Sequence, residues 1–187
     1  MTAPLSARIR AAIEADSAAI GRLHVAAWRE TYRGQVPDRI LDALSVEQRA
    51  AQWHAGLAHG AQGPLLFVAE ESGNGIVGFG AAGRARDAAL GCDGEIYALY
   101  VLHETQGLGF GRALMRHLTE ALIAREIHSM GLWVLTANAP ASDFYRHLGG
   151  AMAGQRSEDL DGWTCHESAF VWRDLPAAMT RFAARRA

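Results

Sequence analysis

Hydrophobic and polar positions along the chain follow two periods, and each change of period predicts an element. "ARIRAAI" has the alternation of a short opening strand. The apolar residues that follow recur at helical spacing, which predicts a helix from Ser17 to about Gly34 with Asp16 as its N-cap. One or two further helices are expected in "PDRILDALSVEQRAAQWHAGL".

Strand patterns dominate the middle of the chain. "PLLFVAEE" and "IVGFGAAGRAR" flank Ser72-Gly73-Asn74-Gly75, which is typical of a tight hairpin. "GEIYALYVL" is rich in residues that fit a pleated sheet. After a glycine-rich segment, an i, i+4 series predicts a long amphipathic helix, formed by Phe110, Leu114, Leu118, Ala121 and Leu122.

The last third of the chain reads as strand, helix and hairpin. "MGLWVLT" predicts a buried strand, and "PASDFYRHLGG" predicts a short helix with Pro140 near its start and Gly149 at its end. Two antiparallel strands are expected around Asp161-Gly162, followed by an amphipathic or frayed segment, "LPAAMTRFAARRA". This order of elements predicts an α/β fold with a mixed, largely antiparallel sheet.

Composition narrows the class of protein. The 187 residues are half hydrophobic, which fits one globular domain, and the net charge of −2 does not favour nucleic-acid binding. All 18 basic residues are arginine, so chemistry that requires lysine is excluded. Cys92 and Cys165 are widely spaced, and no apolar run reaches the length of a membrane span. A cytoplasmic protein without a metal site or a membrane partner is expected.

The stretch "HETQGLGFGRALMRHL" carries the strongest chemical signal. Gly107, Gly109 and Gly111 stand where a strand meets a helix, although glycine in a helix costs roughly 1 kcal/mol relative to alanine. Such a junction gathers backbone N–H groups at the positive end of a helix and suits a phosphate. The alternative is a tight turn that only packs the helix. A dinucleotide GxGxxG pattern fails, because its last position falls on Arg112 or Leu114.

The segment Gln106-Gly107-Leu108-Gly109-Phe110-Gly111 is similar to the Q/R-x-x-G-x-G/A motif of the GCN5-related N-acetyltransferase (GNAT) family. The resemblance covers roughly residues 8–174, most clearly 94–150. It implies a single domain over residues 1–187, with a core at about 8–174 and a tail at 175–187. It also implies a sheet of about six to seven strands with about four helices, splayed at strands four and five.

The resemblance implies acetyl-CoA as cosubstrate and no metal. In the family, the loop amides hold the pyrophosphate, which here assigns Gln106, Gly107, Leu108, Gly109, Phe110, Gly111 and Arg112, the last adding charge. A bulge and splay would expose the strand edge at Leu99, Tyr100 and Val101 to the pantetheine arm. A backbone N–H near Val101 would polarise the thioester carbonyl.

Three further residues match family positions. Glu95 lies eleven residues before Gln106, the spacing of a catalytic base, although it also reads as an ordinary strand carboxylate. Tyr145 matches the tyrosine that protonates the leaving thiolate, the alternative being a core aromatic residue. Asn138 would hold the pantetheine or the helix that carries the tyrosine, the alternative being a strand-end cap.

Some positions and functions stay open at this stage. Trp28 and Tyr32 either roof an acceptor pocket or pack in the core, and the eight histidines, His166 beside Glu167 included, read as solvated or structural. The resemblance implies transfer of an acetyl group to a primary amine of a small molecule or peptide, by direct attack in a ternary complex. Alternatives are a non-catalytic acyl-CoA sensor and a nucleotide-dependent oxidoreductase. A homodimer, through the last strands or the tail, is compatible with the family.

Overall fold

The computed structural model describes residues 7–183 of the chain, so residues 1–6 and 184–187, the two ends of the expected single domain, lie outside the described residues. The strands are β1 (Ala7–Ala11), β2 (Leu65–Glu71), β3 (Gly75–Arg84), β4 (Gly94–Val101), β5 (Met130–Leu135), β6 (Ala151–Leu160) and β7 (Trp163–Trp172). The helices are α1 (Ser17–Tyr32), α2 (Asp38–Asp42), α3 (Val46–Ala58), α4 (Phe110–Ala124), α5 (Ala139–His147) and α6 (Leu175–Ala183).

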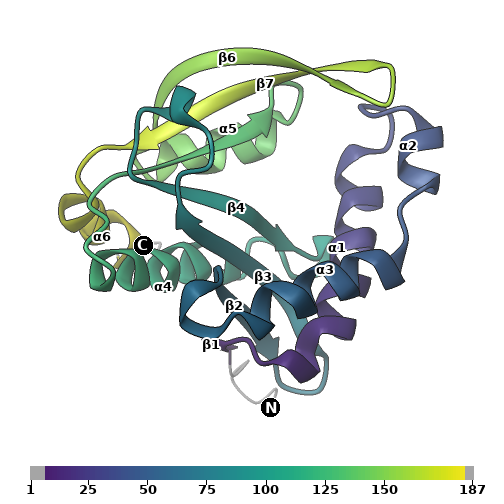
Figure 1. Cartoon of the computed structure of the whole chain (residues 1–187), viewed down its shortest axis with the longest axis horizontal. Coiled ribbons are helices and arrows are strands. Elements are labelled where there is room, and N and C mark those ends of the chain that lie inside the picture. The colour runs from purple at the N-terminus through teal and green to yellow at the C-terminus, as the bar shows by residue number, and fades with distance from the viewer. Residues whose placement is uncertain (1–6, 184–187) are drawn as a thin grey trace.

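One seven-stranded sheet in the order β1-β2-β3-β4-β5-β7-β6 runs through the molecule (Figure 1). Every neighbouring pair is antiparallel except β4 and β5, which are parallel. The mixed, largely antiparallel sheet is thus confirmed. The β4–β5 ladder holds only two residue pairs, Gly94↔Met130 and Glu95↔Gly131. Beyond Glu95 the two strands separate, which confirms the splay at strands four and five.

Local turn chemistry explains why the hairpins form where the sequence predicts them. Gly73 and Gly75 have φ values of 91° and 74° in the β2–β3 turn, a left-handed region in which only glycine is unstrained. Asp161 and Gly162 take φ values of 50° and 73° between β6 and β7. Arg39 of α2 donates to the Asp161 carbonyl at 2.8 Å, so this second hairpin is tied to the N-terminal half of the chain.

The middle of β4 contains the bulge that the family resemblance implies. Ala81 of β3 pairs with Ala98, but Ala82 pairs with Ile96, so Tyr97 is an extra residue in the ladder. The insertion changes which residues share a face. Ile96 and Leu99 join the cluster around α4, whereas the consecutive residues Tyr97 and Ala98 both join the cluster on the opposite face. The bulge therefore re-aims the second half of β4 at the point where β5 departs.

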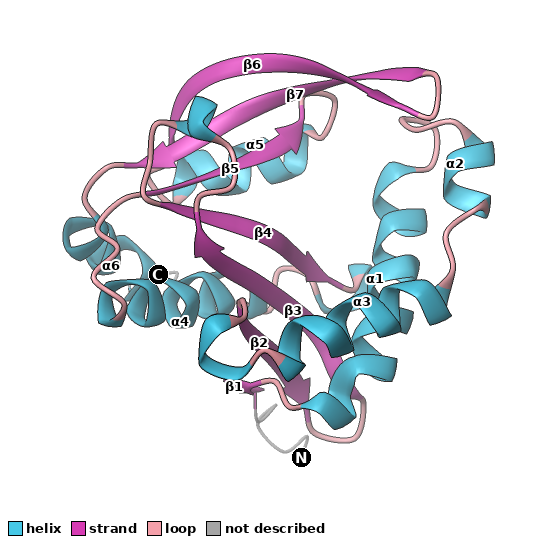
Figure 2. Ribbon diagram, in the orientation of Figure 1, coloured by secondary structure: helices cyan, strands magenta, loops and turns pink. Residues whose placement is uncertain are grey.

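Helices cover both faces of the sheet (Figure 2). On one face α4, α5 and α6 share a core cluster with β5 and β7. The fully buried residues of this cluster include Met115, Leu118, Leu122, Met130 and Phe170. On the other face α1 and α3 pack on β2 to β4 through a cluster that includes Ile20, Leu23, Trp53, Val68 and Phe79. Burying each of these side chains stabilises the fold by about 1.5–3 kcal/mol relative to exposure.

The helices differ somewhat from expectation. Six α-helices are present in residues 7–183, against about four expected, because the region after α1 forms two helices and the chain end forms another. Residues Leu175–Ala183 are not frayed: Leu175, Ala178 and Phe182 are buried in the cluster beneath α4. None of the helices in this part of the chain combines the length and the hydropathy that a membrane crossing requires.

Candidate active site

The glycine loop occupies the junction between β4 and α4. Gly107 and Gly109 have φ values of 77° and 95°, and Gly109 is the N-cap of α4. A Cβ added to either residue would meet no atom within 4 Å, so the space above the loop is open. The first N–H groups of an α-helix have no intrahelical acceptor and lie at the positive end of its dipole. The loop therefore presents backbone donors to an accessible surface, as an anion site requires.

The side chains of Gln106, Phe110 and Arg112 in the loop contact other parts of the protein. Gln106 donates to the Val101 carbonyl at 3.1 Å and so ties the loop to the end of β4, and Phe110 is buried beneath it. Arg112 donates to the Arg181 carbonyl at 2.9 Å. Leu108 is 53% exposed. A phosphate at this loop would therefore meet backbone N–H groups, with Arg112 held towards α6.

Gly111 has a different role from its two neighbours. A Cβ on this residue would lie 3.3 Å from the Cζ of Phe144, so the missing side chain makes room for α5. The φ of Gly111 is not positive. The third glycine of the motif thus serves the packing of α4 on α5. Its backbone N–H stays among the predicted ligands.

The splayed edge of β4 begins after Glu95. Leu99, Tyr100 and Val101 pair with β3 on one side through Gly80, Phe79 and Gly78. On the other side the ladder with β5 has already ended at Glu95. This edge of β4 lies directly before the glycine loop, since Gln106 is bonded to Val101. An extended chain laid along the edge would reach the loop from the middle of the sheet.

Asn138 and Tyr145 project from the two ends of α5. Asn138 is the N-cap of α5, and its side-chain oxygen accepts from the Ala141 N–H at 3.2 Å, so it caps this helix rather than the end of strand β5. Tyr145 lies two turns later and is buried. Its ring centroid is 5.9 Å from that of Phe170 and 6.1 Å from that of Trp172. Burial raises the pKa of the Tyr145 phenol, so its hydroxyl is protonated at neutral pH, as that of an ordinary tyrosine is.

Aromatic side chains from α1 converge on the same region. The Trp28 indole donates to the Tyr100 hydroxyl at 2.8 Å, and the Trp28 and Tyr32 rings meet edge to face at 5.1 Å. Burial raises the pKa of Tyr32, while hydrogen bonding to Tyr100 and Asn138 acts in the opposite direction. The Tyr32 hydroxyl also raises the pKa of Tyr145. The structure thus brings α1, β4 and α5 together at the splay. The ring of Tyr32 packs in the core, and its hydroxyl interacts with Tyr100 and Asn138.

Glu95 lies apart from Tyr32, Tyr100 and Asn138, at the end of β4 that pairs with β5. Its side chain is buried, and both carboxylate oxygens accept hydrogen bonds from Arg86. The backbone N–H of Arg86 lies 2.8 Å from Oε2, and its Nη2 lies 2.6 Å from Oε1. The bulge at Tyr97 separates Glu95 from the splayed residues. The carboxylate is therefore neither solvent-facing nor without partners.

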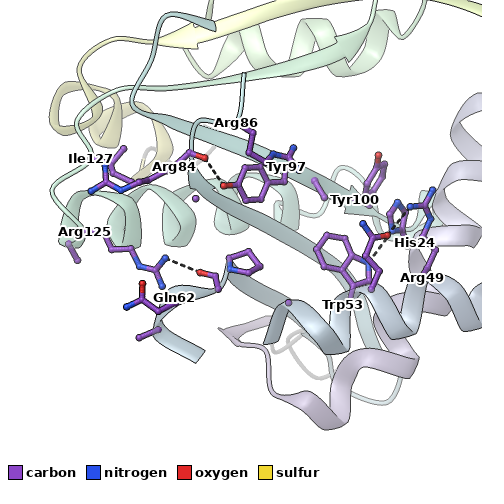
Figure 3. Close-up of a pocket in the computed structure, with 18 of the residues that line it drawn as sticks. His24, Arg49, Trp53, Gln62, Arg84, Arg86, Tyr97, Tyr100, Arg125 and Ile127 are labelled. Atoms are coloured by element: carbon purple, nitrogen blue, oxygen red, sulfur yellow. Dashed lines mark hydrogen bonds between the residues drawn. The ribbon is translucent and has the colours of Figure 1, made fainter. Parts of the chain in front are cut away.

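A pocket of about 980 Å³ lies against β3 and β4 on the face covered by α1 and α3 (Figure 3). Tyr100, Tyr97 and Trp28 line it together with His24 and Trp53. Four arginines also line the pocket, namely Arg49, Arg84, Arg86 and Arg125. No pattern in the sequence predicts that these arginines meet, because they come from α3, the end of β3, the loop after it and the end of α4. No local motif connects positions so far apart.

His24 has a defined protonation state. The Trp53 indole donates to His24 Nδ1 at 3.1 Å, and the imidazole stacks on Tyr100 with ring centroids 5.1 Å apart. Burial, assisted by the charge of Arg49, lowers the pKa of His24 to about 3. The imidazole is therefore neutral at physiological pH. Since Nδ1 accepts a hydrogen bond, the proton sits on Nε2, and this histidine is a hydrogen-bond donor rather than a base.

His166 and Glu167 have partners on the β6–β7 hairpin. The His166 Nδ1 lies 2.8 Å from the Ser157 hydroxyl, and Glu167 pairs with Arg156 at 2.7 Å. Arg156 also stacks on the Trp133 ring at 4.2 Å. Within residues 7–183 no group of three or more histidine, cysteine or carboxylate side chains is arranged to hold a metal ion.

Comparison with known proteins agrees with this architecture. Residues 18–150 match the family described as "Acetyltransferase (GNAT) family". The chain is 31% identical over 172 residues to the uncharacterized N-acetyltransferase YuaI of Bacillus subtilis (strain 168), and the match covers 92% of this chain and 96% of that protein.

Solved structures share the fold at lower identity. PaiA N-acetyltransferase from Thermoplasma acidophilum, in complex with coenzyme A, has a TM-score of 0.67 at 18% identity, covering 87% of this chain and 98% of that one. YncA from Salmonella typhimurium, with its cofactor acetyl-CoA, has a TM-score of 0.69 at 22% identity, and the match covers 97% of this chain and 96% of that one. With the family match over most of its length and a relative above 30% identity, the chain belongs to the acetyltransferase (GNAT) family.

Proposed function

We propose that the protein transfers the acetyl group of acetyl-CoA to a primary amine of a small molecule or peptide. The observation that carries the proposal is the continuity of the splayed β4 edge with the open amide-rich loop, which Gln106 joins to it. The buried Tyr145 phenol is close enough to Tyr100 of that edge to raise the pKa of Tyr100. Two solved structures with the same fold contain coenzyme A or acetyl-CoA.

The residues present fit coenzyme A. The amides of residues 107–112 would bind the pyrophosphate, because Gly107 and Gly109 leave the space above them open. The edge at Leu99–Val101 would pair with the amide groups of the pantetheine arm as an added strand does. An N–H near Val101 would then stabilise the negative charge that develops on the thioester oxygen. Acetyl-CoA supplies an acetyl group already activated as a thioester.

Direct attack requires two proton movements. The amine nitrogen forms a bond to the acetyl carbon while the C–S bond breaks, and the thiolate leaves. Tyr145 is the proposed acid, since its hydroxyl stays protonated and can share that proton with the sulfur as charge develops. Asn138 would orient the helix that carries Tyr145, in keeping with its place as the N-cap of α5.

Glu95 is the proposed base, acting through water. The argument for this role is the position that the GNAT motif assigns to it. Because the carboxylate is buried against Arg86 and the bulge at Tyr97 separates it from the splayed edge, the amine proton would reach it through water.

Initial rates with acetyl-CoA and amine varied together test the proposal. Release of the free thiol is followed, and intersecting double-reciprocal lines are expected, because direct attack needs both substrates bound at once. Parallel lines would indicate a covalent acyl-enzyme and contradict direct attack. Tight binding of acetyl-CoA with no amine-dependent thiol release across amines and peptides would instead support the acyl-CoA sensor.

Two further expectations are compatible with this function. The exposed edge strand β6 (Ala151–Leu160) and the β6–β7 hairpin are where a homodimer of this chain would form. A cytoplasmic site of action fits the use of acetyl-CoA. Sedimentation of the protein with and without coenzyme A would test the first of these expectations.

A further inference from the structure

The pocket beneath α1 and α3 is strongly basic. Four arginines line it, but Glu126 is its one carboxylate lining residue in the part of the chain that the structure describes. The arginines are spread along the cavity, with Arg49 beside His24 at one end, Arg84 and Arg86 around Tyr97, and Arg125 near Gln62 at the other end (Figure 3). The protein as a whole has a net charge of −2, so the excess of positive charge is local to this pocket.

Most of this charge is not neutralised by the protein. Arg86 pairs with Glu95 and stacks on the Tyr97 ring at 3.8 Å. Within residues 7–183 no carboxylate lies within 4.0 Å of the guanidinium of Arg49, Arg84 or Arg125. Arg49 donates to the neutral Gln52 side chain at 3.0 Å, and Arg125 donates to the Gly63 carbonyl at 3.1 Å.

Arg49 stands at the end of the pocket that leads to the splay. Its guanidinium carbon lies 6.0 Å from the centroid of the Trp28 ring. Trp28 in turn donates to the hydroxyl of Tyr100, a residue of the splayed edge. His24, which stacks on Tyr100, offers an Nε2 proton at the same end. A group bound by Arg49 would therefore lie close to the proposed position of the thioester.

Arginine side chains are well suited to binding anionic groups. Its planar guanidinium presents several N–H donors that match the two oxygens of a carboxylate or phosphate. A ligand that carries only positive charge would be repelled by the same pocket. The volume of about 980 Å³ is that of a site for a small molecule, and its aromatic walls offer apolar contact for a short carbon chain.

We infer that the acceptor is a small-molecule amine that also bears a carboxylate or a phosphate, and that Arg49 binds this anionic group. The inference rests on the proposed function, because it takes the pocket as the place from which the amine attacks. Arg49 is a specificity residue in this account, and Arg84, Arg86 and Arg125 extend the positive field along the cavity.

Matched amines test the inference. O-Phosphoethanolamine is compared with ethanolamine, and β-alanine with propylamine, with putrescine as a purely cationic amine, each by thiol release from acetyl-CoA. A hydrogen bond to a charged group is worth enough to change affinity by about tenfold or more, so kcat/KM should be at least about tenfold higher for the anionic member of a pair. The pair with the larger ratio identifies the anion as phosphate or carboxylate.

Arg49→Gln should reduce that ratio to near one. Arg116→Gln, which changes an exposed arginine of α4 outside the pocket, should keep the wild-type ratio and rate. Equal kcat/KM within both pairs for the wild type, or a ratio unchanged in Arg49→Gln, would overturn the inference while leaving the acetyltransferase function intact. Turnover of an acidic peptide far above that of every small amine would overturn the small-molecule assignment.

A binding measurement separates this inference from the proposed function. O-Phosphoethanolamine and β-alanine are titrated against the Tm of the wild type and of Arg49→Gln, without acetyl-CoA. A rise in Tm that depends on Arg49 would support the anion site even if no amine were acetylated. Absence of any shift at millimolar concentrations, together with equal turnover of the matched amines, would contradict the site.

Discussion

Arg86 holds both oxygens of the Glu95 carboxylate, one through its backbone N–H at 2.8 Å and the other through its guanidinium at 2.6 Å. The pair joins the loop after β3 to the start of β4, next to the bulge at Tyr97. The pair fixes the strand where β4 parts from β5, and in the proposed reaction it would orient the base.

Glu95→Gln should lower kcat/KM by up to about 10²-fold at neutral pH, the lower range for loss of a general base. The loss should shrink as the pH rises, because the free amine then needs no base. Arg86→Gln is the matched variant, since it breaks the same ion pair but keeps the carboxylate. Equal losses in both variants at every pH would show that Glu95 only supports the strand.

Tyr145→Phe should lower kcat by about 10²–10⁴-fold and leave the Kd for coenzyme A nearly unchanged. The ring contacts with Phe170 and Trp172 are kept, so the Tm should stay close to that of the wild type. Steady-state kinetics, isothermal titration and thermal unfolding check the three quantities. A variant with preserved kcat and a lower Tm would make Tyr145 a packing residue.

Gly109→Ala should weaken coenzyme A binding by about tenfold or more. The Cβ would stand above the loop, and the φ of 95° is strained for alanine at a cost of roughly 1–2 kcal/mol. Gly73→Ala is a close control, since Gly73 has φ 91° and open space around it, but lies in the β2–β3 turn. Both variants should lose similar stability by denaturant unfolding, and only Gly109→Ala should lose affinity.

Asp16 should make stability depend on pH. The Arg10 guanidinium, with bonds of 2.6 and 2.9 Å, holds the pKa of the Asp16 carboxyl below its ordinary value. A carboxyl with a lowered folded-state pKa stabilises the protein above its unfolded pKa, and this contribution is lost as the pH falls through the folded value. Asp16→Asn should therefore cost about 1.5–3 kcal/mol in unfolding free energy at pH 7, and less at pH 3.

The control for Asp16 is an exposed ion pair. Asp143→Asn removes the 2.8 Å pair with Arg146 on the surface of α5 and should change the unfolding free energy by less than about 1 kcal/mol at any pH. Denaturant titrations of both variants across pH 3–7 check the comparison. A loss for Asp16→Asn that stayed constant with pH would contradict the electrostatic account.

The sequence predicted the elements whose causes are local. Both hairpins follow from turn residues that accept a positive φ, and the glycine loop follows from a contiguous motif. Asn138 and Tyr145 lie in one segment, so their common helix was also predictable. Asp16 was placed correctly at the start of α1, but it makes no side-chain cap there, because its carboxylate binds Arg10 and the Ile13 N–H instead.

Features that depend on distant residues were not predictable. The role of Gly111 depends on Phe144, which lies more than thirty positions away. The basic pocket needs Arg49, Arg84 and Arg125 to meet across separate elements, and only the folded sheet brings them together. The burial of α6 depends in the same way on the face that α4 presents. Pattern along the chain cannot report a contact whose partner lies outside the local segment.

Coupled measurement of both products tests the central claim most directly. Wild-type protein is incubated with acetyl-CoA and a panel of amines, and free thiol and acetylated amine are quantified together. With acetyl-CoA held below its wild-type Kd, the account predicts that the two products appear in equal amounts and that Gly73→Ala retains their formation. In Gly109→Ala and Tyr145→Phe, formation of both products should fall by about tenfold or more. Thiol release without an acetylated amine, or equal activity in Gly109→Ala and the wild type, would contradict the account.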